Sequence, residues 1–168
     1  GVPSAYETDL FVPIVEKTKS LAQAEPNPFA LRVIADHTRA AAFLMTDGVV
    51  PSNEGRGYVL RRIIRRALRY GRKLGLDGAF LHTLLPVVNE MMGEQYPELL
   101  ERHEIVSKQL EQEEKRFAST LNAGTDVASR ELDRIKRGGG TVVRPTSSRT
   151  VRALNGGYDT IDPCFIEQ

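Results

Sequence analysis

Apolar residues recur every three to four positions through most of residues 6–137, which is the spacing of amphipathic α-helices. Glycine and proline clusters separate the periodic stretches, whereas 141–168 shows no helical period. The pattern predicts helices over 6–23, about 28–45, 56–74, a segment between Asp77 and Met92, about 97–122, and 125–137. We therefore expect an all-α fold, a helical bundle of about five to six helices with an irregular or short-β C-terminal tail.

Several of the predicted helix ends carry local signals. Thr8 or Asp9 is expected to cap the first helix and Asn27 the second, because such side chains accept hydrogen bonds from unpaired backbone N–H groups. Asp77 is expected to cap the fourth helix in the same way. Within that helix, Pro86 predicts a kink or a break, because proline has no N–H to donate.

The helix predicted over 56–74 is strongly basic. Residues 55–76 include eight arginines and lysines and no aspartate or glutamate. At about 100° per residue, most of these cations share an arc of roughly 140° opposite an apolar face. We name this arc the basic stripe, and it consists of Arg61, Arg62, Arg65, Arg66, Arg69, Arg72 and Lys73. Because like charges repel, the stripe needs either carboxylates from a neighbouring helix, for which the six acidic residues of 98–114 qualify, or an external polyanion such as nucleic acid.

Two polar side chains near the basic helix are open to more than one interpretation. The glycine-rich loop over 46–57 places Asn53 at the mouth of the helix, where asparagine commonly acts as an N-cap. The alternative is that its amide, which both donates and accepts hydrogen bonds, reads a base edge. On the preceding helix, Asp36 is spaced to form a surface ion pair with Arg32 or Arg39.

The composition is that of an ordinary globular chain, with 40% hydrophobic and 27% charged residues. The single cysteine, Cys164, excludes an internal disulfide, and the three histidines lack metal-ligand spacing. We find no nucleophile paired with a base, no phosphate-binding loop, and no apolar run approaching about 18 residues. The residues alone therefore predict a binding module for RNA or DNA phosphates, without a cofactor or a membrane partner, in a reducing cytoplasmic setting.

Several stretches of the chain closely resemble alanyl-tRNA synthetases. The resemblance is most specific in the Pro51-Ser52-Asn53 loop and the basic helix that follows it. The matching stretches are 30–39 and 47–66, with 6–11 similar to the segment after the last class II motif, and 113–117 and 131–132 similar to the long helices that follow. Together they extend over about 5–137.

The resemblance implies a role in choosing tRNA. In that family this helical region docks the acceptor stem beside the class II catalytic domain, and the tRNA is selected by a G·U wobble at its third acceptor pair. The family contacts that pair through an asparagine in a Pro-Ser-Asn loop and an aspartate in a later Tyr-Asp-Thr-Tyr-Gly-Phe-Pro motif. By resemblance, Asn53 is the loop reader and Asp36 lines the same region. The candidates for phosphate or packing contacts are Arg61, Arg62, Arg65, Arg66 and Arg69.

The last thirty residues depart from the family pattern. Asp159, within Tyr158-Asp159-Thr160, corresponds to the second reader, but Ile161-Asp162-Pro163 replaces the Tyr-Gly-Phe that follows in the family. The tail over 138–168 is therefore divergent, mistranslated or artificial, and either a short strand pair or disorder fits its composition.

The resemblance also implies a division of the chain and a place within a larger enzyme. Residues 1–26 would be the end of the catalytic-domain region with a linker helix, 27–137 the tRNA-recognition domain, and 138–168 the tail. The first residue is glycine rather than methionine, so we expect a piece of a longer protein. The motifs that bind ATP and alanine would precede it and a zinc-bearing editing domain would follow it, so ATP, Mg and Zn belong to the whole enzyme.

Two functions from different classes follow for this chain. The first is a part of an alanine–tRNA ligase that binds the tRNA acceptor stem and packs against the catalytic domain, and that does not aminoacylate by itself. The alternative is a structural helical bundle that braces a neighbouring domain and has no RNA affinity.

Overall fold

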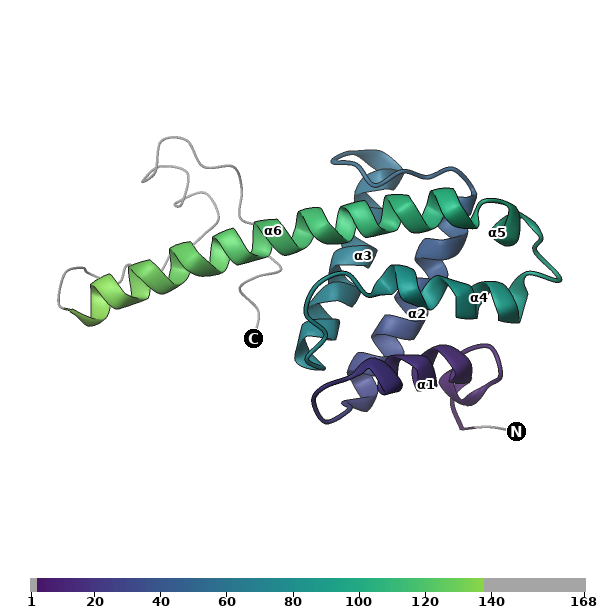
Figure 1. Cartoon of the computed structure of the whole chain (residues 1–168), viewed down its shortest axis with the longest axis horizontal. Helices are drawn as coiled ribbons and strands as arrows, with labels where there is room; N and C mark the ends of the chain where they lie inside the picture. The colour runs from purple at the N-terminus through teal and green to yellow at the C-terminus, as the bar shows by residue number, and fades with distance from the viewer. Residues whose placement is uncertain (1–2, 138–168) are drawn as a thin grey trace. The chain divides into compact units, whose positions relative to one another are not determined.

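A computed structural model describes residues 3–137 of the chain. Within this range all regular structure is helical and no strand is present, which confirms the all-α expectation (Figure 1). The elements are η1 (Ala5–Glu7), α1 (Val12–Leu21), α2 (Pro28–Thr46), α3 (Gly55–Lys73), η2 (Leu81–Leu84), α4 (Leu85–Met92), α5 (Glu98–Glu101) and α6 (His103–Lys136). By its internal contacts the chain divides into two units, Gly1–Ala123 and Gly124–Gln168. The predicted tail over 138–168, Asp159 included, lies outside the described residues.

The first predicted helix is shorter than the pattern indicated. A 3-10 turn, η1, comes first, and α1 begins only at Val12, so neither Thr8 nor Asp9 caps it. Thr8 instead closes η1: its backbone is extended and its hydroxyl donates to the carbonyl of Ala5 at 2.6 Å. An extended residue at this point interrupts the helix, which apolar spacing alone cannot show.

Helix α2 begins as its sequence predicts. The Oδ1 atom of Asn27 accepts hydrogen bonds from the backbone N–H groups of Phe29, at 2.9 Å, and Ala30, at 3.2 Å. Pro28 occupies the first turn, where its missing N–H leaves no donor unsatisfied. Asn27 is therefore the N-cap, and this local signal was sufficient to predict it.

Helices α2 and α3 pack along one another and form the centre of the core. The basic helix contributes one apolar face to it, while the basic stripe lies on the remaining surface. The side chains that are almost completely buried at this centre include Ile34 of α2, Leu60 and Ile64 of α3, Leu84, Leu85 and Val88 around α4, and Leu110 of α6. Helix α1 adds Ile14 to the same core and packs on α2. The burial of large aliphatic side chains supplies the main stabilisation of such a bundle.

The fourth predicted helix is divided at its proline. Residues Leu81–Leu84 form the 3-10 helix η2, and Pro86 lies in the first turn of α4, so the break that it predicted is confirmed. Asp77 is not the cap, which corrects the prediction, because Phe80 occupies the N-cap position and makes no side-chain cap bond. The carboxylate that does the capping comes from Glu114 of α6 and accepts from the N–H groups of residues 80–82 at 2.7, 2.7 and 3.2 Å.

The last helical region breaks at a different place from the one predicted. A short α5 ends at Glu101, and α6 then runs from His103 to Lys136. Arg102, the C-cap residue between them, donates from its guanidinium to the carbonyl of Thr46 at 3.0 Å. The predicted break at 122–124 is absent: Gly124 is helical, and an interior glycine costs only about 1 kcal/mol relative to alanine. None of the helices described combines the length and the apolar character that a bilayer span needs.

Substituting Gly71 by alanine should destabilise the fold. A Cβ atom at this buried position of α3 would run into the ring of Phe80, at the start of η2. We expect the free energy of unfolding to fall by about 1–3 kcal/mol, as for other overpacked sites. Gly124→Ala is the matched control, because its Cβ atom would meet nothing within 4 Å and should be neutral or stabilising. Urea unfolding of both variants, followed by circular dichroism, measures the difference, and equal stabilities would contradict this packing.

Candidate nucleic-acid interface

The basic stripe divides into half-buried and exposed members. Arg61 and Arg65, whose side chains are 15% and 36% exposed, face α6. Arg62, Arg66 and Arg69 are exposed to solvent, as is Lys73 near the end of α3. The stripe therefore has one edge against α6 and another edge in contact with solvent.

Glu113 of α6 is the carboxylate that meets the half-buried edge. Its side chain is 3% exposed, and its Oε1 atom lies 3.0 Å from Nε of Arg61 and 3.2 Å from Nη2 of Arg65. Nε of Arg65 also donates to it at 3.2 Å. The expected acidic partner within 98–114 therefore exists, but one carboxylate balances only one of the two guanidinium charges.

Other cations of the stripe lie over an aromatic ring or donate a hydrogen bond to an amide oxygen. Arg66 and Lys73 both lie over the ring of Tyr70 on the same helix, at 5.9 and 5.1 Å from the ring centroid. Among residues 3–137 neither of these two side chains lies within ion-pair distance of a carboxylate. A cation–π contact positions a cation without neutralising it, so this part of the stripe keeps its positive charge. Arg72 donates to Oδ1 of Asn122 on α6 at 2.8 Å, which is also a neutral partner.

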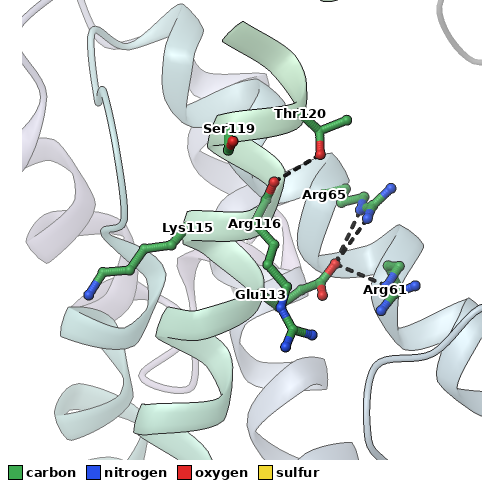
Figure 2. Close-up of a pocket in the computed structure, with 7 residues that line it drawn as sticks. All are labelled: Arg61, Arg65, Glu113, Lys115, Arg116, Ser119 and Thr120. Atoms are coloured by element: carbon green, nitrogen blue, oxygen red, sulfur yellow. Dashed lines mark hydrogen bonds and ion pairs between the residues drawn. The ribbon is translucent and has the colours of Figure 1, made fainter. Parts of the chain in front are cut away.

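Beside the Glu113 pair there is an open hollow of about 610 Å³ between α3 and α6. Figure 2 shows the carboxylate of Glu113 directed at Arg61 and Arg65, with the other lining residues carried by α6. The complete lining is Arg61, Arg65, Glu113, Lys115, Arg116, Ser119 and Thr120. Its four cations outnumber the two carboxylates that pair with them, Glu113 with Arg61 and Arg65, and Glu111 with Lys115. The hollow therefore keeps a net positive charge, which suits a phosphate group.

Sequence reasoning did not identify the α6 residues of this site. The available signal was the spacing of Leu110, Glu113, Glu114 and Phe117, which recur at the intervals of one helix face. All four are buried. Two carboxylates on a core-facing stripe must be paired with cations or N–H donors, since an unpaired buried charge is very costly. The spacing therefore predicts a partner for each carboxylate, although not the identity of that partner.

Asn53 does not cap α3, so that interpretation was wrong. The N-cap position is Glu54, and no side chain there makes a cap bond. Instead, the Oδ1 atom of Asn53 accepts a hydrogen bond from Nη1 of Arg61, and the Asn53 side chain is exposed. Nη2 of Arg61 also donates to the carbonyl of Pro51 at 3.3 Å, so this arginine ties the loop to the helix.

Gly57 allows the loop to lie close against the first turn of α3. The backbone N–H of Ser52 donates to the carbonyl of Gly57 at 3.1 Å, and the Ser52 hydroxyl donates to the carbonyl of Glu54 at 2.8 Å. A Cβ atom at position 57 would collide with the carbonyl oxygen of Val50 and with Ser52. The conformation that presents Asn53 therefore requires glycine at this position.

Asp36 has a different partner from those its spacing suggested. Its Oδ2 atom lies 2.8 Å from Nδ1 of His37, and its own side chain is 46% exposed. Arg32 and Arg39, the predicted partners, lie instead over the rings of Tyr6 and Phe11, at 5.6 and 4.5 Å from the centroids. The predicted ion pair is therefore wrong in its partner.

The structure brings together only some of the predicted site residues. Asn53 and Arg61 are in direct contact, and Glu113 links Arg61 to Arg65. Within residues 3–137, Asp36 contacts none of these three predicted residues.

The ionisable side chains of the described residues show no metal centre. Among residues 3–137 no group of histidine, cysteine or acidic side chains is arranged to hold a metal ion. The pKa of Glu111 on α6 is lowered by a hydrogen bond from Lys115 and by the charge of that ammonium group, at 2.6 Å. This is an exposed helix-surface pair, which favours the charged carboxylate and offsets the charge that Lys115 brings to the hollow.

A comparison with protein families identifies the chain. The family model described as tRNA synthetases class II (A) matches residues 1–146. The chain belongs to this family. The match confirms the resemblance that the motifs indicated and extends beyond residue 137, where the resemblance was expected to end.

Most of the chain is similar in sequence to part of the alanine–tRNA ligases of several bacteria. The ligase of Geobacillus thermodenitrificans is 44% identical over 147 residues, which is 84% of this chain and 17% of the ligase. Those of Pseudoalteromonas translucida and Desulfosudis oleivorans are each 50% identical, over 81% and 82% of the chain and 16% of each ligase. The chain thus spans about one sixth of the length of the curated relatives it matches.

Proposed function

We propose that this chain is the part of an alanine–tRNA ligase that binds the tRNA acceptor stem, with 27–137 as the recognition domain and the catalytic domain of the same cytoplasmic enzyme as its neighbour. The observation that carries the proposal is the pair of exposed cations Arg66 and Lys73, which keep their charge over the ring of Tyr70, together with the electropositive hollow at Arg65 and Arg116. Phosphate contacts supply most of the affinity in protein–nucleic acid complexes and position the protein on the helix.

Within this proposal the residues have separate tasks. Arg62, Arg66 and Arg69 would contact the phosphates, since they lie on the exposed edge. Asn53 would read the third G·U pair, because its exposed amide lies at the mouth of the same helix and is held in place by Arg61. Asp36 and Asp159 remain candidates from the resemblance alone. In the whole enzyme, ATP and Mg would activate alanine at a site in the catalytic domain. The part described here would contribute by positioning the tRNA next to that site.

A specific observation favours the structural alternative. Glu113 and Glu114 of α6 are both buried and paired with groups of other elements, as expected of a helix that stabilises a bundle. This accounts for Arg61 and Arg65 but not for the exposed cations Arg66 and Lys73. A bundle that only braced a neighbouring domain would gain nothing from the like charges collected there.

The proposal is tested by binding the full chain to an alanine acceptor-stem hairpin that carries G·U or G·C at the third pair, at low and moderate salt. Tighter binding to G·U supports acceptor-stem recognition. Equal but salt-sensitive binding to both stems would show that the chain binds RNA in general without recognising the third pair. No binding at either salt would favour the structural bundle.

Replacing Asn53 with alanine should reduce discrimination between the two stems. If its contact with the pair is direct, the G·U preference should fall by about 1–3 kcal/mol, because each good base contact contributes about that much. The measurement is the ratio of the two dissociation constants for the variant and for the unmodified chain. Equal losses on both stems would show that Asn53 only maintains the loop.

A further inference from the structure

Arg61 is held by three groups from two other parts of the fold. Nη1 donates to Oδ1 of Asn53, Nη2 donates to the carbonyl of Pro51, and Nε lies 3.0 Å from the carboxylate of Glu113 on α6. Two of the three guanidinium nitrogens therefore donate hydrogen bonds within the fold, and the third, Nε, is at ion-pair distance from Glu113 without a hydrogen bond to it. Because its side chain is only 15% exposed, Arg61 has little surface left for an external phosphate, unlike the exposed Arg66.

The contact with Arg61 determines the direction of the Asn53 amide. A guanidinium group carries only N–H donors and no acceptor, so the atom of Asn53 that faces it must be the amide oxygen. The Nδ2 group, at the other end of the planar amide, then faces away from Arg61. Since Asn53 is exposed, this end of the amide is available to a ligand.

We propose that Arg61, braced by Glu113, is the positioning residue for Asn53, and that Asn53 consequently offers a hydrogen-bond donor to the third base pair. The inference rests on the proposed function and goes further by assigning the chemistry of the contact. The recognised atom is an acceptor on a base edge, such as a carbonyl oxygen or an unprotonated ring nitrogen. Arg61 acts through Asn53 and does not touch the RNA.

The arrangement places part of the specificity outside the loop itself. Glu113 belongs to α6 and lies 48 residues after Arg65 in the sequence. Its carboxylate contacts both Arg61 and Arg65, which lie one turn apart on α3. An amide that is already oriented loses less conformational freedom when it binds, so more of its interaction energy appears as discrimination. A loop without this brace would leave the amide free to present either end.

The first test requires no RNA. In the full chain labelled with nitrogen-15, we expect the side-chain NH₂ group of Asn53 to be ordered on the picosecond–nanosecond timescale. Arg61→Lys keeps the charge but has one nitrogen, which cannot reach Asn53, Pro51 and Glu113 together, so the amide should become mobile. Arg66→Lys on the same helix is the matched control and should leave it ordered. An amide equally ordered in Arg61→Lys would overturn the proposal.

The second test measures discrimination between the G·U and G·C hairpins. Arg61→Lys should lower the ratio of affinities as Asn53→Ala does, by about five- to 150-fold. In the variant that already carries Asn53→Ala, adding Arg61→Lys should not lower the ratio further, because both changes remove one coupled contact. Arg66→Lys, at a proposed phosphate contact, should change both affinities by the same factor and so leave their ratio unchanged. A ratio that Arg61→Lys does not alter would overturn the positioning role and leave the proposed function standing.

Asn53→Asp separates a donor from an acceptor. Aspartate has the same shape and keeps an oxygen for Arg61, but it has no N–H to donate. We expect the G·U preference to be lost as fully as with alanine, whereas a retained preference would show that Asn53 reads as an acceptor and would overturn the assignment. Arg61→Gln provides a second variant if Arg61→Lys unfolds, and circular dichroism checks both. An amide ordered by Arg61 in a chain that binds neither hairpin would support positioning and refute the proposed function.

Discussion

Replacing Glu114 with alanine is expected to lower the free energy of unfolding by about 3–5 kcal/mol, the range found when one partner of a buried charged network is removed. Its carboxylate accepts four hydrogen bonds or ion-pair contacts, from the backbone N–H groups of residues 80–82 and from Nδ1 of His82 at 2.8 Å. Alanine would leave these donors without their acceptor in a buried position, and each unsatisfied group costs about 1–3 kcal/mol.

The effect should extend beyond one hydrogen-bonded turn. Phe80, whose N–H donates to Glu114, also packs its ring where Gly71 of α3 has no side chain. Glu114 therefore joins α6, η2 and α3 at a single point of the core. Loss of this point should loosen α6 against α3 and weaken the Glu113 pair as well.

Urea unfolding of the full chain measures this prediction. Glu104→Ala is the matched control, because Glu104 is an exposed carboxylate on the same helix. It should change stability by no more than about 0.5 kcal/mol. The stability of Glu114→Gln should lie between those of Glu104→Ala and Glu114→Ala. The amide oxygen of the glutamine still accepts hydrogen bonds from the backbone but carries no charge. A loss below about 1 kcal/mol in Glu114→Ala would contradict the capping role.

Binding of the acceptor-stem hairpin should weaken steeply with salt. Each neutralised phosphate contributes about 0.7–0.9 to the slope of log affinity against log salt. Four exposed cations, Arg62, Arg66, Arg69 and Lys73, would then give a slope of about −3. A fourfold increase in salt should weaken binding by about 50- to 150-fold.

Removing two of these cations tests which residues cause the slope. The variant Arg66→Ala with Lys73→Ala loses both side chains that lie over Tyr70, and its slope should be smaller by about 1.4–1.8. Lys19→Ala, which removes an exposed cation of α1 that is paired with Glu16, is the control for net charge. If the two changes reduce the slope equally per charge removed, binding is a property of the whole chain and not of the stripe.

Local sequence was sufficient wherever the cause of a structure lies within a few residues. Asn27 caps α2, Pro86 ends one helical segment and starts another, and the spacing of Leu60 and Ile64 identifies the buried face of α3. In each case the cause lies within one or two turns of the same helix: a capping side chain, a missing N–H group, or the helical period that puts Leu60 and Ile64 on one face. The family, too, followed from contiguous motifs, above all the loop before the basic helix.

The tertiary structure decided what each polar side chain does. Glu114 provides the cap that was expected from Asp77. Glu113 forms ion pairs with two arginines of the basic stripe, and Arg61 donates a hydrogen bond to the amide oxygen of Asn53. Arg65 and Glu113 are 48 residues apart, and Glu114 lies more than 30 residues from the N–H groups it caps. A carboxylate or guanidinium group bonds with whichever complementary group packing brings within about 3 Å, and local spacing carries no information about contacts over such separations. The sequence by itself therefore determined the all-α class, the basic stripe and the family. Only the tertiary structure determined where several helices begin and break, which cations stay exposed and which way Asn53 faces.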